Sequence, residues 1–114
     1  MRKIGGNITA QLQVKTTRKN SIGESVSTWE TRHFLTGFLD LASGDSRYTT
    51  YGSKIQESTH YFLCDYVPFE ADVGAENSRL IINGKTYAVT LIDNPMELNY
   101  HLEIYLKYTG AQNG

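Results

Sequence analysis

The sequence predicts a small all-β protein, an antiparallel β-barrel or sandwich with one long internal loop. Two β-rich runs flank the pair Asn83-Gly84, which predicts a tight hairpin because both residues tolerate a positive φ. Apolar residues alternate with polar ones over 8–14 and again over 98–108, which is the period of a half-buried strand. A sheet of roughly five or six strands with no partner helix must curl or fold on itself to cover its apolar face.

The composition indicates one domain over residues 1–114 with a core of its own. The 11 Lys and Arg are matched by 12 Asp and Glu, so tight autonomous DNA binding is disfavoured. Cys64 is the only cysteine, which rules out an internal disulfide. The basic first residues lead into no long apolar run, so we expect neither a signal peptide nor a transmembrane segment, and folding in a cytosol.

The first expected element is a strand over 8–14, with Ile8, Ala10, Leu12 and Val14 facing the core. Residues 1–6 before it read as a flexible lead-in. The polar stretch 16–25 contains Asn20-Ser21 and Gly23, and it predicts a loop or an open hairpin end.

Residues 26–41 are rich in Thr, Phe, Trp and Leu, but neither face is cleanly apolar. Trp29 and Leu35 fall on one side by parity, and Phe34 and Phe38 fall on the other. Three accounts are open: burial on both sides, a bulge near Gly37 that exchanges the faces, or a short helix over 34–41. We favour the bulged strand, because glycine within a strand often marks a bulge.

The stretch 42–54 is small and polar, and it predicts the long loop. A loop of this length in a compact domain is either functional or simply exposed surface, and these alternatives carry similar weight. Arg47, Tyr48, Tyr51 and Lys54 interleave charge with aromatic rings, a pattern suited to nucleic-acid backbone contact and base stacking.

The remaining expected elements are, in order, an aromatic strand over 59–66, an acidic connector over 69–77, the hairpin over 79–92 that stops at 93–95, a last strand over 98–108 and a flexible tail over 110–114.

No constellation for catalysis stands out. Cys64 lies mid-strand and predicts a small buried hydrophobe rather than a thiolate paired with His33, His60 or His101. The histidines and the cysteine lack metal-site spacing, and the glycines form no phosphate-cradling motif. Asp93 and Glu97, near Pro95, fit turn-forming and solvated roles. We therefore expect no enzymatic activity, no metal and no cofactor.

The order of features along the chain resembles the phage head closure, or head–tail joining, proteins, a family of small β-barrels in tailed phages and prophages. The resemblance covers nearly the whole sequence. It is carried by the alternating first strand, the loop leading to Trp29, Ser43-Gly44, Ser58-Thr59-His60, Asp65-Tyr66, Asn83-Gly84-Lys85-Thr86-Tyr87, Asp93-Asn94-Pro95 and Glu103-Ile104-Tyr105-Leu106.

The resemblance implies a virion structural protein of the head–tail interface that is assembled in the host cytoplasm and has no contact with a membrane. Family members form a ring below the portal that closes the DNA channel after packaging and provides the docking surface for the tail. The implied partners are the portal-adaptor connector protein, a tail-completion or tail-tube protein, other copies of the chain in a dodecameric ring formed from free monomers, and packaged double-stranded DNA. In this reading 42–54 is the channel-gating loop, and Arg47 and Lys54 face the DNA.

An enzyme would gain support only if the fold brought a histidine within hydrogen-bond reach of Cys64 or of a carboxylate pair in a cleft. Two further alternatives stay open. One is a neighbouring tail-completion or adaptor protein of the same connector. The other is a monomeric β-barrel module for oligonucleotides or saccharides, in which bases or sugars stack on Tyr48 and Tyr51.

Overall fold

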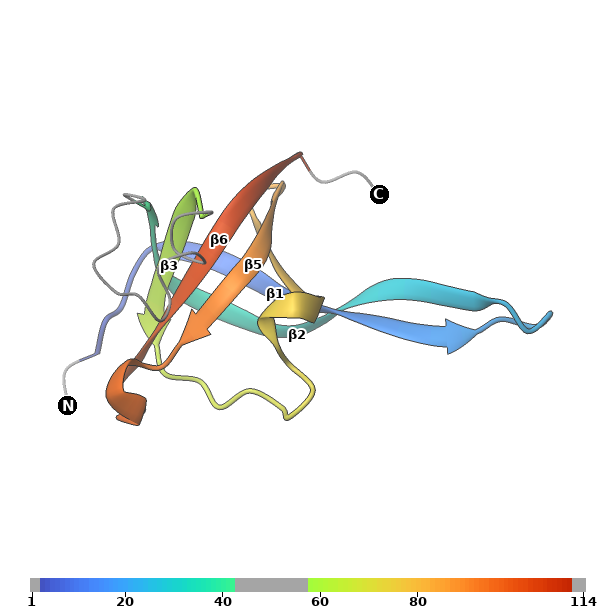
Figure 1. Cartoon of the computed structure of the whole chain (residues 1–114). Coiled ribbons are helices and arrows are strands. Elements are labelled where there is room, and N and C mark those ends of the chain that lie inside the picture. Colours follow the sequence, from blue (N-terminus) through green and yellow to red (C-terminus); the bar gives the residue numbers. More distant parts are fainter. Residues whose placement is uncertain (1–2, 43–57, 112–114) are drawn as a thin grey trace.

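Six antiparallel strands close into a barrel in the order β1-β2-β3-β6-β5-β4, in a computed structural model that describes residues 3–42 and 58–111 (Figure 1). The predicted all-β class is confirmed. Of the two predicted architectures, barrel and sandwich, the structure shows the barrel. Nearly all of the predicted long loop lies outside the described residues. The elements are β1 (Ile8–Lys19), β2 (Ser25–Leu41), β3 (His60–Asp65), the 3-10 helix η1 (Ala75–Asn77), β4 (Ser78–Ile82), β5 (Lys85–Asp93), the 3-10 helix η2 (Pro95–Glu97) and β6 (His101–Ala111).

The core fills the barrel interior with alternate residues from all six strands. On β1, Ala10, Leu12 and Val14 are buried, as the alternation predicts. Burying each large side chain stabilises the fold by roughly 1.5–3 kcal/mol relative to exposure. The buried cluster consists of Ala10, Leu12, Leu35, Phe62, Cys64, Leu80, Ile82, Tyr87, Val89, Leu102, Ile104 and Leu106.

Strand β2 carries a bulge, but its predicted position near Gly37 is wrong. Leu12 pairs with His33 and Gln13 pairs with Thr31, so Arg32 is the extra residue. One extra residue reverses the facing of everything beyond it. Leu35 therefore points into the barrel, although Trp29, of the same parity, lies on the outside.

Gly37 has a different function, which is to let three backbone segments approach closely. A Cβ at Gly37 would collide with the carbonyl oxygen of Leu63 on β3, and a Cβ at Gly6 would collide with the Gly37 backbone. These segments fit together only because two of them lack side chains at the contact.

The end of β1 and the start of β2 leave the barrel and form a projecting arm, defined here as residues 16–28 (Figure 1). The prediction of a loop over 16–25 is therefore too long, and the hairpin-end alternative is correct: Lys19 pairs with Ser25, and only 20–24 turn. The Asn20 side chain closes the turn by accepting hydrogen bonds from the Ile22 and Glu24 amides at 3.0 and 2.9 Å. The arm gives the molecule its length of 49 Å, against 29 and 26 Å in the other directions.

The β4–β5 hairpin forms where the sequence predicts it. Asn83 and Gly84 have φ of 52° and 75°. A positive φ at both central residues is the signature of the type I′ turn, whose twist matches that of the flanking strands.

Strand β6 begins and ends later than predicted. Asn94 and Asn99 bind each other across η2: the Asn94 side chain donates to that of Asn99 at 2.7 Å and accepts from its amide at 3.1 Å. Leu98 and Tyr100 consequently precede the strand and are half exposed. At the other end, Gly110 and Ala111 still pair with β5, within the stretch for which the sequence predicts a flexible tail.

The segment before β1 is tied to the barrel where the sequence predicts a flexible lead-in. The Ile4 amide donates to the carboxylate of Asp65 at 2.7 Å. Gly6 packs against Gly37, as described above.

Candidate functional site

The residues that the sequence marks for DNA proximity cannot be placed. Arg47, Tyr48, Tyr51 and Lys54 all fall within 43–57, outside the described residues.

Large apolar side chains stand out on the outer surface of β2. Phe34 is 70% exposed and Phe38 is 46% exposed, and both point away from the core because the bulge at Arg32 sets the facing. Leu41, at the strand end, is also 70% exposed. Exposed aromatic residues on one face of one strand are typical of an interaction surface rather than of scattered surface hydrophobes.

The apolar surface continues onto the neighbouring strands. Leu63 of β3 pairs with Phe38, and Tyr61 of β3 pairs with Tyr105 of β6. The two tyrosine rings lie 6.0 Å apart, within the range of favourable aromatic pairs. We call Phe34, Phe38, Tyr61, Leu63 and Tyr105 the outer stripe; it crosses β2, β3 and β6.

The bulge residue Arg32 anchors the acidic connector between β3 and η1. Its terminal nitrogens donate to the two carboxylate oxygens of Asp72 at 2.9 and 2.7 Å, and its Nε donates to Glu30. Arg32 lowers the pKa of Asp72, and the carboxylates in turn raise the pKa of Arg32. The connector thereby lies against the outside of β2.

A second contact fastens the same connector. His33 Nε2 lies 3.0 Å from a carboxylate oxygen of Glu70, and this hydrogen bond lowers the pKa of Glu70. The His33 ring also packs on Phe69 at 5.1 Å between centroids. The sequence marks 69–77 as acidic but gives no sign of these partners, because they depend on the position of the bulge.

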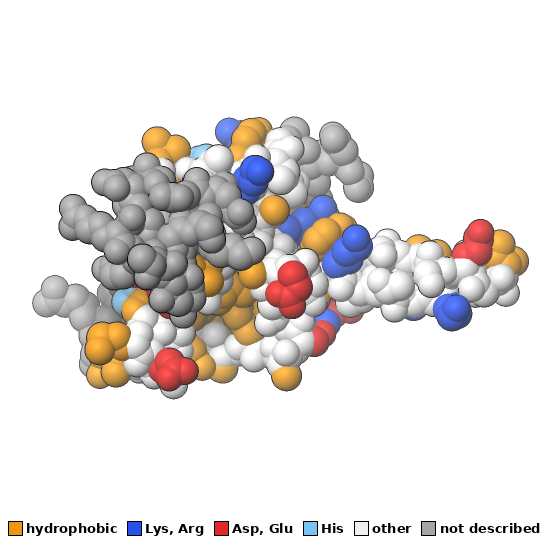
Figure 2. Space-filling model, viewed as in Figure 1, with side chains coloured by type: hydrophobic (Ala, Val, Ile, Leu, Met, Phe, Trp, Pro, Cys, Tyr) orange, Lys and Arg blue, Asp and Glu red, His pale blue; other side chains and the backbone are white. Residues whose placement is uncertain are grey.

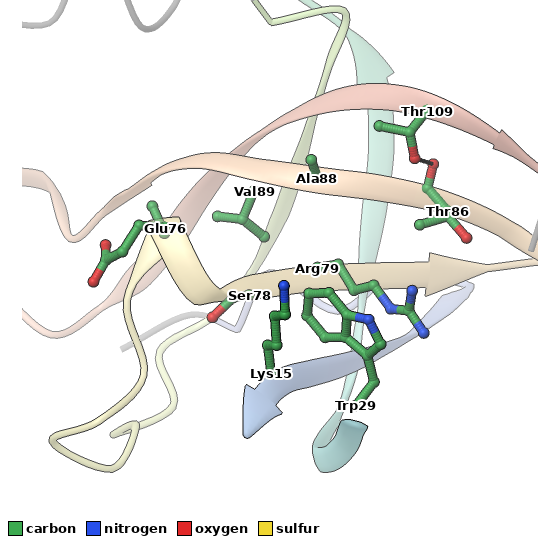
Figure 3. Close-up of a pocket in the computed structure, with 10 residues that line it drawn as sticks. Lys15, Trp29, Glu76, Ser78, Arg79, Thr86, Ala88, Val89 and Thr109 are labelled. Atoms are coloured by element: carbon green, nitrogen blue, oxygen red, sulfur yellow. Dashed lines mark hydrogen bonds between the residues drawn. The ribbon is translucent and has the colours of Figure 1, made fainter. Parts of the chain in front are cut away.

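A pocket of about 400 Å³ lies where the arm meets the barrel (Figure 3). The Arg79 guanidinium of β4 lies 4.2 Å above the Trp29 ring of β2, a cation–π geometry. Lys15 of β1, paired with Trp29, lines the same pocket. Sequence reasoning does not find this pocket, since its residues come from both ends of the chain.

Cys64 is fully buried in the core, which confirms the prediction of a small buried hydrophobe. Burial raises the pKa of its thiol to about 12, and the charge of Asp65 adds to this effect. A thiol with this pKa is almost fully protonated at neutral pH and is a poor nucleophile.

A small polar cluster on β5 and β6 also contains titratable groups. His101 Nε2 lies 3.2 Å from Glu103, and the Tyr105 hydroxyl donates to Glu103 at 2.9 Å. Burial, followed by the charge of Glu103, raises the pKa of Asp93. Among the described residues no group of His, Cys, Asp or Glu side chains is arranged to hold a metal ion.

No described helix is long and apolar enough to cross a membrane.

Comparison with known proteins gives a fold neighbour only. No protein-family model matches the chain, and no curated protein matches it significantly. A similar solved structure is the solution structure of protein SF1141 from Shigella flexneri 2a, with a TM-score of 0.70 and 19% identity over 96% of this chain and 97% of that one. At this identity the likeness shows a shared fold, and the chain is therefore similar to SF1141 in architecture across nearly its whole length.

Proposed function

We propose that this protein is a structural component of a phage head–tail connector, which assembles as a ring beneath the portal and its adaptor. The outer stripe is the main supporting observation: Phe34 and Phe38 are both exposed on the outer face of β2. A surface of this kind has a clear use when it is covered by a neighbouring subunit. The resemblance of the ordered motifs to head closure proteins is the reason for proposing a head–tail connector rather than another assembly.

In this proposal the ring closes the DNA channel after packaging and offers a docking surface to the tail. Residues 42–54 form the channel-gating loop, with Arg47, Tyr48, Tyr51 and Lys54 near the packaged DNA. A ring repeats a weak basic patch many times, so avidity compensates for the near-neutral charge of one chain.

The test is assembly on purified portal–adaptor complexes, followed by cryo-electron microscopy. We expect a ring of added density below the adaptor with the wild-type chain. Phe34→Ser together with Phe38→Ser should abolish it, because both substitutions remove apolar surface from the interface. Met96→Ser is the matched control, since Met96 is 86% exposed but lies outside the stripe. Wild-type protein that never adds density would overturn the proposal, and density in the tail-completion position would favour the neighbouring role.

A second candidate is a monomeric module that binds oligonucleotides or saccharides. It is favoured by the pocket that Trp29 lines together with Lys15 and Arg79, because an aromatic ring beside basic side chains suits contact with oligonucleotides. It also uses Tyr48 and Tyr51 as stacking platforms. Titration with single-stranded oligonucleotides and oligosaccharides tests it: unchanged tyrosine and tryptophan fluorescence would exclude it.

A further inference from the structure

The pocket at the root of the arm is lined by residues of five strands and of η1. Lys15 and Trp29 come from the arm side, and Arg79 comes from β4 (Figure 3). Figure 2 shows the narrow arm projecting from the barrel. The other lining residues are Ala75, Glu76, Ser78, Thr86, Ala88, Val89 and Thr109.

The guanidinium of Arg79 is held in one orientation. Its Cζ lies 4.2 Å from the centroid of the Trp29 ring, and its Nε donates to the Gln13 side-chain oxygen at 2.8 Å. Gln13 is itself fixed, because it is buried and donates to the Thr31 hydroxyl at 3.1 Å. Only the two terminal nitrogens of Arg79 remain, and together they make the fork that binds a carboxylate with two parallel hydrogen bonds.

Arg32, which binds the connector, shows by comparison what Arg79 lacks. Arg32 is satisfied by Asp72 and Glu30. Within the described chain, Arg79 has no carboxylate at ion-pair distance and no hydrogen-bond acceptor for its terminal nitrogens. Partial burial removes water from the charged Arg79 guanidinium and lowers its pKa. An anion bound beside it would offset this loss of hydration.

The charges around the pocket favour a single carboxylate. Lys15 and Arg79 contribute two positive charges and Glu76 contributes one negative charge, which leaves one positive charge in excess. Figure 3 shows Glu76 at the opposite end of the pocket from Arg79, so it does not satisfy the fork. A nucleic-acid backbone calls for a continuous basic track, whereas this site is a recess with an acid at its far end.

The rest of the lining combines small apolar side chains with the hydroxyl groups of Ser78, Thr86 and Thr109. Ala75, Ala88 and Val89 line the pocket together with the indole of Trp29. Apolar walls around one fixed charge are suited to a peptide in which apolar residues flank an acidic one.

We propose that this pocket binds an acidic side chain of a partner protein chain, with Arg79 holding its carboxylate through both terminal nitrogens and the apolar wall receiving the flanking residues. Lys15 adds long-range attraction from the rim. The proposal does not depend on the connector function, because it follows from the pocket alone.

Trp29 provides a direct reporter, because it is the only tryptophan in the chain. The probes are two capped peptides, Leu-Glu-Leu and its neutral analogue Leu-Gln-Leu, titrated to millimolar concentrations at low salt. The readouts are tryptophan fluorescence and the indole N–H signal in proton–nitrogen correlation spectra. The acidic peptide should shift both in a saturable way, and the neutral peptide should bind at least about tenfold more weakly.

Two variants separate the fork from general charge effects. Arg79→Gln should weaken binding of the acidic peptide at least about tenfold, whereas Arg18→Gln, the same charge change on the exposed arm, should leave it within about twofold. Should Arg79→Gln fail to fold, the two peptides on the wild-type chain still decide the matter. The proposal would be overturned if both peptides bound equally well, or if Arg18→Gln weakened binding as much as Arg79→Gln. It would also be overturned if inorganic phosphate or free 3-phenylpropionate bound more tightly than the acidic peptide.

Discussion

Arg32 donates two hydrogen bonds to the carboxylate of Asp72, which lies forty residues further along the chain. The arginine is available for this contact because it is the extra residue of the β2 bulge. One irregularity in a strand thus fixes the path of the connector between β3 and η1.

The first prediction concerns acid sensitivity of this connector. The pKa of Asp72 is lowered by Arg32 and that of Glu70 by His33, so the folded state binds fewer protons than the unfolded state. The stabilisation is complete above the ordinary pKa values of 3.8 and 4.5, and it is lost as the pH falls through the lowered values. We expect the connector amides to lose protection from hydrogen exchange below about pH 4 while the barrel amides keep theirs.

Asp72→Asn tests the cause. It should weaken connector protection at neutral pH and remove much of its dependence on acid. Glu97→Gln, on an exposed side chain in η2, is the control. A connector that responds to acid equally in both variants would contradict this account.

The second prediction concerns Cys64. Its thiol is buried and its pKa is raised to about 12, so a thiol reagent at pH 8 should react only as fast as the protein opens. The measured rate should rise sharply across the denaturant-induced unfolding transition. Rapid modification of the native protein would show that β3 is accessible and would weaken the description of the core.

The third prediction concerns Gly37. Gly37→Ala should destabilise the protein by roughly 1–3 kcal/mol, because the added methyl group meets the carbonyl oxygen of Leu63 and the backbone must shift. Urea denaturation measures the loss. Thr36→Ala on the adjacent exposed position is the control and should stay within about 0.5 kcal/mol of the wild type. Equal stability of Gly37→Ala and wild type would mean that the segments do not approach as closely as described.

The fourth prediction concerns the arm. None of residues 16–28 is buried, so the arm contributes little to the core. Joining Lys15 to Trp29, which face each other across the root, by a two-residue Asn-Gly turn should change Tm by less than about 5 °C. Calorimetry of the shortened chain provides the measurement, and loss of cooperative unfolding would show that the arm is needed for folding.

Local signals in the sequence predict the parts of this fold that depend on local chemistry. Asn83 and Gly84 predict their turn because both readily adopt a positive φ. The alternation of apolar and polar residues predicts that Leu12 faces the core. Such reasoning does not locate the bulge at Arg32, because one extra residue reverses the direction of the side chains beyond it without changing the residue types in the strand. Gly37 is a misleading sign, since its missing side chain serves packing rather than a bulge.

The candidate site is harder to predict for the same reason. The partners Arg79 and Trp29 lie fifty residues apart in the sequence, and they meet only after β1 has paired with both β2 and β4. Phe34 and Phe38 look like core residues by composition, and the position of the bulge decides that they face outward.

The arm has one more consequence, for solution behaviour. Closure of the barrel removes sheet edges, but along the arm each strand pairs on one side only among the described residues. Unpaired backbone groups of this kind can recruit further strands and start open-ended fibres. Arg18 and Lys19 place positive charge on that edge, and two arms brought together would repel each other. Replacing both with threonine would therefore remove this repulsion and promote aggregation of the protein through the edges of the arm.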